Sequence, residues 1–246
     1  MARTRVTTTK YEIMQVAAEC FFSVGFTATS PRMIADELGL STGNITYYFP
    51  SKEHLLLAIV ERLCDFQLKM LEAQDNIGTD SVAAVCLETM TVAVACEESQ
   101  IAREFFTAAF QSELCRNYLR ENHVERAKKV FKSWCPDWTN EKYQEAELLV
   151  MGLQYAAIAP TDANVQTKTR VSGALNQILS IYHMDEEARQ KEIQKVLDVD
   201  CRGISKRVLQ EFVIYMKKTN EETLLQMLNG NWKSNAKKTS EVKEVG

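Results

Sequence analysis

Residues 30–53 read SPRMIADELGLSTGNITYYFPSKE and predict two short helices that meet at a glycine. Ser30 has the side chain of a helix N-cap, and Pro31 follows at the first helical position, where its missing N–H costs nothing. Gly39 ends the first helix, because a residue without a Cβ readily adopts the left-handed conformation that turns the chain. Ser41 then caps the second helix. This pattern is typical of a helix-turn-helix.

The second of these helices is predicted to turn small polar and aromatic groups outward. Ile45 is expected to face the core, which places Thr42, Gly43, Asn44 and Tyr47 on or near the opposite face. At Gly43 the absence of a side chain lets the helix approach another surface closely. Because the N-terminal part of such a helix contacts base edges in the major groove, we expect this face to read DNA.

The end of the stretch is predicted to meet the DNA backbone. Phe49 and Pro50 close the two-helix unit, and Ser51 is expected to cap the next helix. Lys52 lies in the first turn of that helix, where the helix dipole disfavours a cation unless an anion is close. A DNA phosphate would supply that anion. The predicted DNA contacts are Ser30, Arg32, Ser41, Thr42, Gly43, Asn44, Tyr47, Tyr48 and Lys52.

Residues 9–57, about a quarter of the chain, resemble the DNA-binding domain of the TetR family of bacterial transcriptional repressors. The family's pattern is a first helix with paired alanines and aromatics, a glycine, the two-helix unit, and an aromatic-rich end followed by Phe-x-Ser-Lys-Glu. Thr46 stands where the family usually has a tyrosine, and Tyr47 and Tyr48 supply hydroxyls nearby. The resemblance is carried by Ile13, Ala17, Ala18, Phe21, Phe22, Gly25, Thr27, Ser30, Ile34, Ala35, Gly39, Ser41, Gly43, Ile45, Tyr47, Phe49, Ser51, Lys52, Glu53 and Leu55.

The resemblance implies a fold and a function for the whole chain. The expected fold is all-α, with a three-helix DNA-binding domain over residues 1–50 and a larger helical ligand-binding and dimerisation domain over residues 51–230. The expected function is that of a repressor that binds a palindromic operator on double-stranded DNA as a homodimer and responds to a small-molecule effector. Residues 231–246 are polar and nearly free of apolar side chains, so we expect a mobile tail.

The composition agrees with a soluble helical protein. The chain has 246 residues, of which 46% are hydrophobic and 25% charged, and only nine glycines and four prolines interrupt it. Such sparse helix breakers favour long helices over many short strands. No uninterrupted apolar run reaches the length that crosses a bilayer, and the N-terminus lacks the apolar core of a signal peptide. A cytoplasmic location without membrane contact is therefore expected.

The charge distribution restricts where DNA could bind. The formal net charge of −4 argues against a broadly basic DNA-binding surface. Residues 1–52 hold five basic and four acidic residues, so the excess of negative charge lies in the remainder of the chain. Arg3 and Arg5 are expected on an arm ahead of the first helix, where they either neutralise phosphates or belong to a solvated terminus.

Helical periodicity extends over most of the chain. The first helix is expected over residues 10–24, from a Thr9-x-x-Glu12 capping box to Gly25. Its apolar side is expected to hold Ile13, Ala17, either Cys20 or Phe21, and Val24. A long helix over residues 51–73 would continue from the two-helix unit into the body of the protein. Residues 81–97 are apolar nearly all round and predict a central, buried helix. Further helices are expected at residues 99–111, 114–134, 140–159, 167–183, 185–198 and 203–218.

Two of these helices are candidates for subunit contact. The first carries Leu148, Met151, Gly152, Tyr155 and Ala156, and the small residues among them allow close helix approach. The second carries Val171, Leu175, Ile178 and Tyr182, and the stripe Ile204, Val208, Phe212 and Tyr215 is expected to enlarge the dimer interface. The alternative for all three stripes is packing inside one subunit.

Candidates for the lining of an effector pocket come from four of the predicted helices. They are Phe66, Met70, Met90, Val94, Phe106, Phe110 and Gln154, with Phe105 and Tyr118 beside them. Such an aromatic and methionine stripe is also what an ordinary core requires. Glu88, Thr91 and Glu97 lie in or beside apolar stretches, where a carboxylate is costly without a cationic partner. Glu88 therefore suggests a partly apolar, cationic effector.

Other functional classes have less support in the sequence. We expect no enzyme, metal site or cofactor, because there is no Gly-rich phosphate loop, metal-ligand cluster or nucleophile motif. The seven cysteines mostly lie in apolar stretches and are interpreted as core residues, with a thiol-based sensor as the alternative. A helical dimeric scaffold, or a ligand-binding protein with a degenerate DNA-binding unit, is the alternative function. Such a protein would show no steep salt dependence of DNA affinity.

Overall fold

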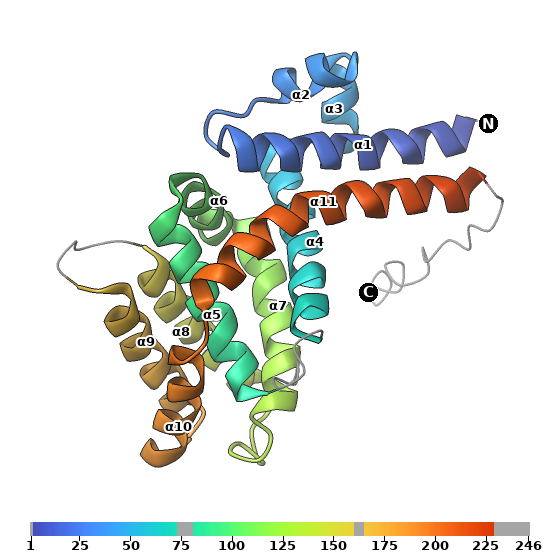
Figure 1. Ribbon diagram of the computed structural model, residues 1–246. Coiled ribbons are helices and arrows are strands. Elements are labelled where there is room, and N and C mark those ends of the chain that lie inside the picture. Colours follow the sequence, from blue (N-terminus) through green and yellow to red (C-terminus); the bar gives the residue numbers. More distant parts are fainter. Residues whose placement is uncertain (1, 73–80, 160–164, 229–246) are drawn as a thin grey trace, which may run out of the picture.

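The computed structural model describes residues 2–72, 81–159 and 165–228, and within these ranges the chain forms eleven α-helices and no strand (Figure 1). The all-α prediction is confirmed, and the predicted tail lies outside the described residues. No helix in these ranges has the length and apolar character that crossing a bilayer requires. The helices are α1 Ala2–Ser23, α2 Pro31–Leu38, α3 Thr42–Tyr48, α4 Lys52–Glu72, α5 Val82–Glu98, α6 Gln100–Gln111, α7 Glu113–Val130, α8 Asn140–Ile158, α9 Thr167–Ile181, α10 Glu186–Leu197 and α11 Cys201–Leu228.

Helices α1 to α3, which we call the N-terminal domain, lie at one end of the molecule, and their buried apolar residues are continuous with the core of the body (Figure 1). Ile13, Phe21, Ile34 and Ile45 are fully buried there, as the periodicity predicted. The prediction for Val24 is wrong. Its side chain is 49% exposed, because α1 ends at Ser23 and the chain turns away from the core before Gly25.

Helix α1 begins earlier than predicted. It starts at Ala2 rather than at Lys10, so Thr9 lies inside the helix and does not form a capping box. Arg3 and Arg5 consequently lie in the first turns of α1 and not on an arm ahead of it. The physical reason is that residues 2–10 contain neither glycine nor proline, and threonine lowers helix propensity only slightly.

The body of the protein is built around α5. Most residues of this helix are buried, which confirms the predicted central helix, and it packs against α6, α8, α9, α10 and α11. Helix α4 runs from the N-terminal domain down along α7 and α11 (Figure 1). Helix α7 ends at Val130, four residues before the predicted end, and Phe131 then stacks on Tyr182 at 3.8 Å between ring centroids.

Helix α11 is longer than predicted and crosses the molecule beneath α1 (Figure 1). Its apolar stripe is not available to a second subunit. Phe212 is fully buried, and its ring centroid lies 5.7 Å from that of Phe22 on α1 and 5.7 Å from that of Phe66 on α4. Val208 is also buried, whereas Ile204 and Tyr215 are half-buried against the core. The stripe therefore joins α11 to the N-terminal domain of its own chain, which corrects the predicted dimer role.

The stripe on α9 is also core. Val171, Leu175, Ile178 and Tyr182 are each at most 1% exposed, so the prediction that they contact another subunit is wrong. They are covered by α5, α8 and α10, which pack on α9 within the same chain. The predicted contact residues on α8 differ in exposure. Met151 is buried and Tyr155 is half-buried. Leu148, Gly152 and Ala156 are exposed.

Candidate functional site

The two-helix unit has the cap geometry that its sequence predicts. The Ser30 Oγ accepts a hydrogen bond from the Met33 N–H at 3.2 Å, and the Ser41 Oγ accepts one from the Asn44 N–H at 3.3 Å. Gly39 ends α2 with φ of 63° and ψ of 30°, in the left-handed region. These contacts fix the angle between α2 and α3, because each helix begins and ends at a residue with a defined conformation.

The outward face of α3 is the candidate DNA-reading surface. Thr42, Gly43 and Asn44 are all exposed, and they lie in the first turn of the helix. Ile45 on the opposite side is fully buried in the hydrophobic core, and α3 packs against α2. Arg32 on α2 is exposed as well, and its guanidinium lies 3.7 Å from the Asp36 carboxylate. A solvated pair at this distance leaves Arg32 free to exchange its partner for a phosphate.

The end of α3 carries two tyrosines and the threonine that departs from the family pattern. Tyr47 is 76% exposed, and its ring packs edge to face on Tyr48, 5.1 Å away. The Thr46 hydroxyl lies within hydrogen-bonding distance of two backbone carbonyls of its own helix, those of Thr42 at 3.4 Å and Gly43 at 3.2 Å. Tyr47 thus presents an exposed phenol at this end of the unit.

The structure gives Lys52 a different partner from the predicted phosphate. Its Nζ donates hydrogen bonds to the backbone carbonyls of Phe26 at 2.9 Å, Thr27 at 3.3 Å and Thr29 at 3.0 Å. The ammonium also lies 4.4 Å from the centroid of the Phe26 ring. An ammonium has three N–H donors, and here each has an acceptor. Lys52 therefore ties the loop between α1 and α2 to the start of α4.

Lys52→Met is expected to lower the free energy of unfolding by about 2 kcal/mol, because three carbonyls lose charge-assisted hydrogen bonds. Thermal or urea unfolding measures this change. Lys142→Met is the matched control, since Lys142 also lies over an aromatic ring, that of Trp138, but its side chain is 48% exposed. The control should change stability by less than about 0.5 kcal/mol. Equal effects of the two substitutions would contradict the role given to Lys52.

A cavity of about 60 Å³ lies in the body between α4, α5, α6, α7 and α8. We call it the central cavity. Its lining is mostly apolar and aromatic, and its polar members are Gln67, Glu88, Thr89, His123 and Gln154. The Gln154 Nε2 donates to the Thr89 Oγ1 at 3.4 Å. The other lining residues are Val60, Leu63, Cys64, Val92, Phe105, Phe106, Ala109, Phe110, Leu119 and Ile158.

The seven predicted pocket residues do not converge on one cavity. Phe106, Phe110 and Gln154 line the central cavity, and Met70 lines a smaller one beneath α11. Met90 and Val94 face a separate hollow beside the start of α9, and Phe66 packs against Phe212 and Tyr215. Periodicity identifies the buried side of each helix, but not which neighbouring helix covers it.

The charged residues that line the central cavity have partners of opposite charge in the same chain. Glu88 forms an ion pair with Arg126, so its carboxylate already has a cationic partner within the chain. This corrects the suggestion that Glu88 calls for a cationic effector. Another carboxylate, that of the buried Glu147, accepts a hydrogen bond from the Tyr182 hydroxyl and lies 3.5 Å from the Nδ1 of His123. Sequence reasoning missed this cluster, although Glu147 stands inside an apolar helical stretch.

The His123–Glu147 pair makes stability depend on pH. Burial opposes ionisation of His123, but the hydrogen bond and negative charge of Glu147 outweigh it and raise the pKa of His123 above its ordinary value. The stabilisation by this pair is therefore complete below the ordinary histidine pKa of about 6.5 and is lost as the pH rises through the raised pKa.

His123→Gln is accordingly expected to cost about 2 kcal/mol of unfolding free energy near pH 5.5 and distinctly less near pH 9. Urea titrations of both proteins at the two pH values measure the difference. His183→Gln is the control, because His183 is exposed and lies outside the cluster. A cost for His123→Gln that does not change with pH would show that the imidazole is neutral throughout.

The cysteines have the environment of core residues. Five of the seven are buried, and none is disulfide-bonded. Burial raises the pKa of the Cys64, Cys86 and Cys96 thiols to about 12. Since the thiolate is the reactive form, these three thiols are unreactive at neutral pH.

Comparison with known proteins identifies the N-terminal part of the chain. Residues 13–59 match the family model described as bacterial regulatory proteins, tetR family. The HTH-type transcriptional regulator RutR of Escherichia coli (strain K12) and that of Shigella flexneri are each 38% identical to the chain over 68 residues. The aligned segment covers 28% of this chain and 32% of each relative, so the chain spans about a third of the length of these curated relatives.

Proposed function

We propose that this protein, whose N-terminal domain belongs to the tetR family of bacterial regulatory proteins, is a ligand-responsive transcriptional repressor that binds a palindromic operator as a homodimer. The observation that carries the proposal is the first turn of α3. Its exposed residues Thr42, Gly43 and Asn44 stand opposite the fully buried Ile45. A rigid helix with small polar groups at its N-terminal end has the shape and the hydrogen-bonding groups that read a major groove.

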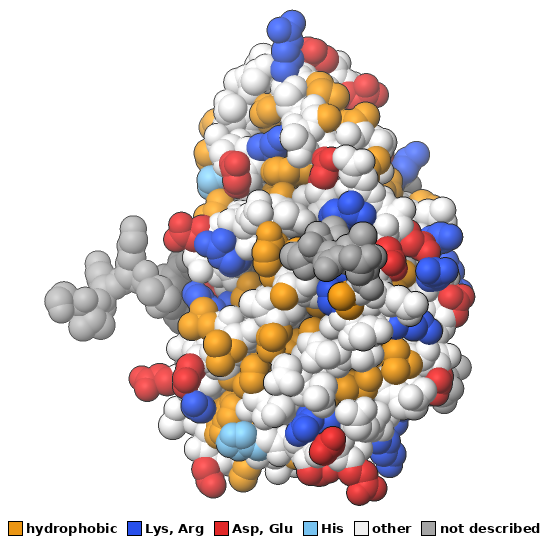
Figure 2. Space-filling view, turned by 90° about the vertical axis from the view of Figure 1, so that its left-hand side faces the viewer, with side chains coloured by type: hydrophobic (Ala, Val, Ile, Leu, Met, Phe, Trp, Pro, Cys, Tyr) orange, Lys and Arg blue, Asp and Glu red, His pale blue; other side chains and the backbone are white. Residues whose placement is uncertain are grey.

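A dimer is proposed because one such helix contacts too few base pairs for useful specificity. The exposed side of α8 is the surface we propose for the contact. Leu148 and Leu149 are each 57% exposed, and Gly152 and Ala156 continue the same stripe one and two turns further along the helix. Hydrophobic side chains also gather on the lower half of the face where α9 and α10 lie (Figure 2). Exposed apolar residues in a continuous stripe are typical of a protein interface.

The proposed effector response uses α4. This helix begins at Lys52, directly after the two-helix unit, and its residues Val60, Leu63 and Gln67 line the central cavity. A cavity of about 60 Å³ is far smaller than the roughly 300–1,000 Å³ of ordinary ligand sites, so an effector must displace a wall. Displacement of α4 would change the separation of the two DNA-reading surfaces, which must lie about 34–36 Å apart to occupy successive major grooves. The effector would then favour the state that releases DNA.

The proposed function is tested by selecting bound fragments from the source genome with the purified protein and titrating the best fragment at several salt concentrations. The logarithm of the affinity should fall linearly with the logarithm of the salt concentration, because phosphate contacts release counterions. A palindromic consensus among the selected fragments is expected. Absence of any enriched fragment would contradict the proposal and favour a scaffold.

Thr42→Ala combined with Asn44→Ala is expected to weaken binding to the selected site by about thirtyfold or more, since two base contacts are lost and each contributes about 1–3 kcal/mol. The salt dependence should stay the same, because these residues do not neutralise phosphates. Fluorescence anisotropy with a labelled fragment measures both quantities. Asn117→Ala, an exposed change on α7, is the control. Unchanged site preference in the double variant would contradict the assignment of α3 as the reading helix.

A further inference from the structure

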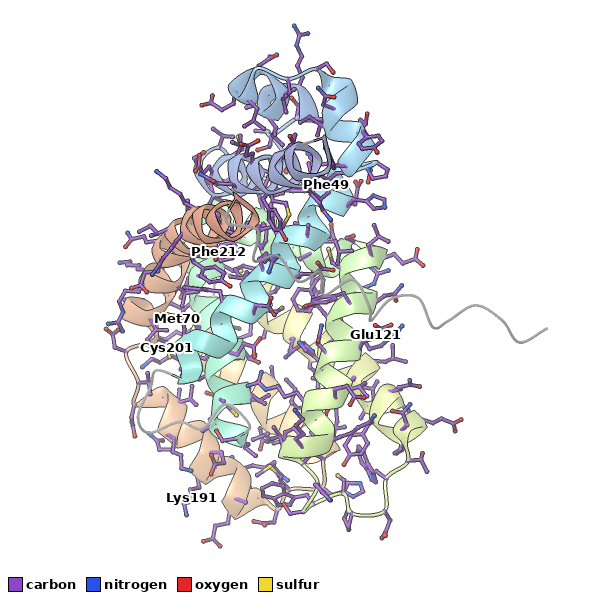
Figure 3. The ribbon with its side chains drawn as sticks, turned by 90° about the vertical axis from the view of Figure 1, so that its right-hand side faces the viewer. Phe49, Met70, Glu121, Lys191, Cys201 and Phe212 are labelled. Carbon is purple, nitrogen blue, oxygen red and sulfur yellow. The ribbon has the colours of Figure 1, made fainter. Side chains whose placement is uncertain are left out.

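Resting on the proposed function, we propose that the effector site extends from the central cavity into a second cavity beneath α11, and that one elongated, uncharged, largely apolar molecule occupies both. The second cavity measures about 40 Å³ and lies between α4, α5 and α11. We call it the α11 cavity. Its walls include Met70 of α4, Leu87 and Thr91 of α5, and Ile204 and Val208 of α11. Figure 3 shows Met70 on the lower part of α4, on the side along which α11 runs.

The two cavities share a wall. Gln67 of α4 and Glu88 of α5 line both of them, so these two side chains separate the spaces. Glu88 is held by Arg126 on α7, which leaves Gln67 as the movable part of the partition. A glutamine side chain has three rotatable bonds, and its rotation would join the cavities without a change in the backbone.

Each cavity holds a buried oxygen that lacks a hydrogen-bond partner among the described residues. In the central cavity it is the Oε1 of Gln154, and in the α11 cavity it is the Oγ1 of Thr91, a residue only 7% exposed. Buried polar groups are nearly always paired, so each of these oxygens needs a partner, which a ligand in the cavity would supply. The amide oxygen of Gln154 can only accept, so the ligand must carry an N–H or O–H donor there.

The charges around the two cavities favour an uncharged ligand. Glu88 is compensated by Arg126, and His123 faces Glu147. Arg207, which borders the α11 cavity, is exposed and therefore hydrated, so it adds little attraction for an anion. A charged group inside either cavity would lose its hydration and find no buried, uncompensated counter-charge among the described lining residues.

A ligand in both cavities would act on two connections to the N-terminal domain. One is α4, which lines both cavities. The other is α11, which lines the second cavity and packs along α1. A molecule confined to the central cavity would contact only the first of them. The effector would thus move α1 as well as α3, because α11 supports α1 from below (Figure 1).

The test uses the full chain and the neutral fluorescent dye N-phenyl-1-naphthylamine, which has an elongated apolar body and one N–H donor. Its sulfonated relative 8-anilinonaphthalene-1-sulfonate supplies the matched anion. We expect saturable binding of one neutral dye per chain and at least tenfold weaker binding of the anion. Absence of saturable binding, or equal binding of the anion, would overturn the proposed ligand class.

Two variants that narrow the cavities separately test whether the site is continuous. Ala109→Val reduces the central cavity, and Thr91→Met reduces the α11 cavity. Each is expected to lower the affinity for the neutral dye at least tenfold, as is Gln154→Leu, which removes the acceptor. Ile214→Met, a substitution at an exposed position of α11, should change the affinity for the neutral dye less than twofold. If Thr91→Met has no effect while Ala109→Val does, the ligand is confined to the central cavity and the inference is wrong. If neither has an effect, the dye binds elsewhere and the inference is also wrong.

The same proteins are titrated with the selected DNA fragment in the absence of dye. If all variants bind the fragment with the affinity and salt dependence of the wild-type chain, the proposed function is supported independently of the dye measurements. Failure of the proposed function would instead appear as absence of a selected fragment for the wild-type chain. Thermal unfolding of each variant confirms that lost dye binding does not reflect lost folding.

Discussion

Phe212→Ala is expected to lower the free energy of unfolding by about 3–5 kcal/mol, the usual cost of truncating a buried phenylalanine. Phe212 is fully buried, and its ring contacts Phe22 of α1 and Phe66 of α4. Figure 3 marks Phe212 on α11, beneath α1. The truncation leaves a cavity where three helices meet, and none of them can close it without losing its other contacts. Urea unfolding followed by circular dichroism measures the change.

Ile214→Ala is the control for this prediction. Ile214 lies on the same helix but is 66% exposed, so its truncation should change stability by less than about 0.5 kcal/mol. Because Phe212 joins α11 to the N-terminal domain, the Phe212 variant should also show faster hydrogen exchange in α1 than in α5. A loss below about 1 kcal/mol would mean that α11 is not firmly packed on α1 and α4.

The second large effect is expected at the exposed stripe of α8. Leu148→Glu combined with Leu149→Glu places two negative charges on each side of the proposed interface, where they meet like charges across a two-fold axis. The protein should become monomeric, as measured by analytical ultracentrifugation. Its affinity for the palindromic fragment should fall by a factor on the order of 10²–10⁴, because the two half-sites are no longer bound together.

Stability of the subunit should be nearly unchanged by the same substitutions, since Leu148 and Leu149 are each 57% exposed. Ile214→Glu is the matched control, because it introduces the same charge at an exposed apolar position of α11. It should leave both the oligomeric state and the DNA affinity as they are. A double variant that remains dimeric would place the subunit contact on another face of the molecule.

The N-terminal domain was predicted well because its signals are local. Ser30, Gly39 and Ser41 act on residues within one helical turn, and each has the predicted hydrogen bonds or conformation. The start of α1 was predicted wrongly because a local pattern was misleading. Thr9-x-x-Glu12 has the residues of a capping box but lies inside the helix, and residues 2–8 carry no breaking signal that would stop the helix from extending to Ala2.

The body of the protein was predicted less well because its contacts join distant residues. The acceptors for Lys52 lie at least 23 positions away in the chain, and the Glu88–Arg126 and His123–Glu147 pairs join different helices. Periodicity placed Val171 and Leu175 of α9 and Phe212 of α11 on apolar faces correctly. It did not show whether the same chain or a second copy would cover those faces, and here the same chain covers them.

The position of α11 beneath α1 affects whether the N-terminal domain could be transplanted onto another protein. In a modular regulator, a DNA-reading domain could be transplanted onto another effector domain to change the operator it recognises. Here Phe22 of α1 is packed on Phe212 of α11, so residues 2–50 depend on a helix that starts at Cys201. A chimera that takes the N-terminal domain alone would expose that apolar surface to water. The packing of the proposed DNA-reading domain therefore depends on residues from both the first and the last helix that the structure describes.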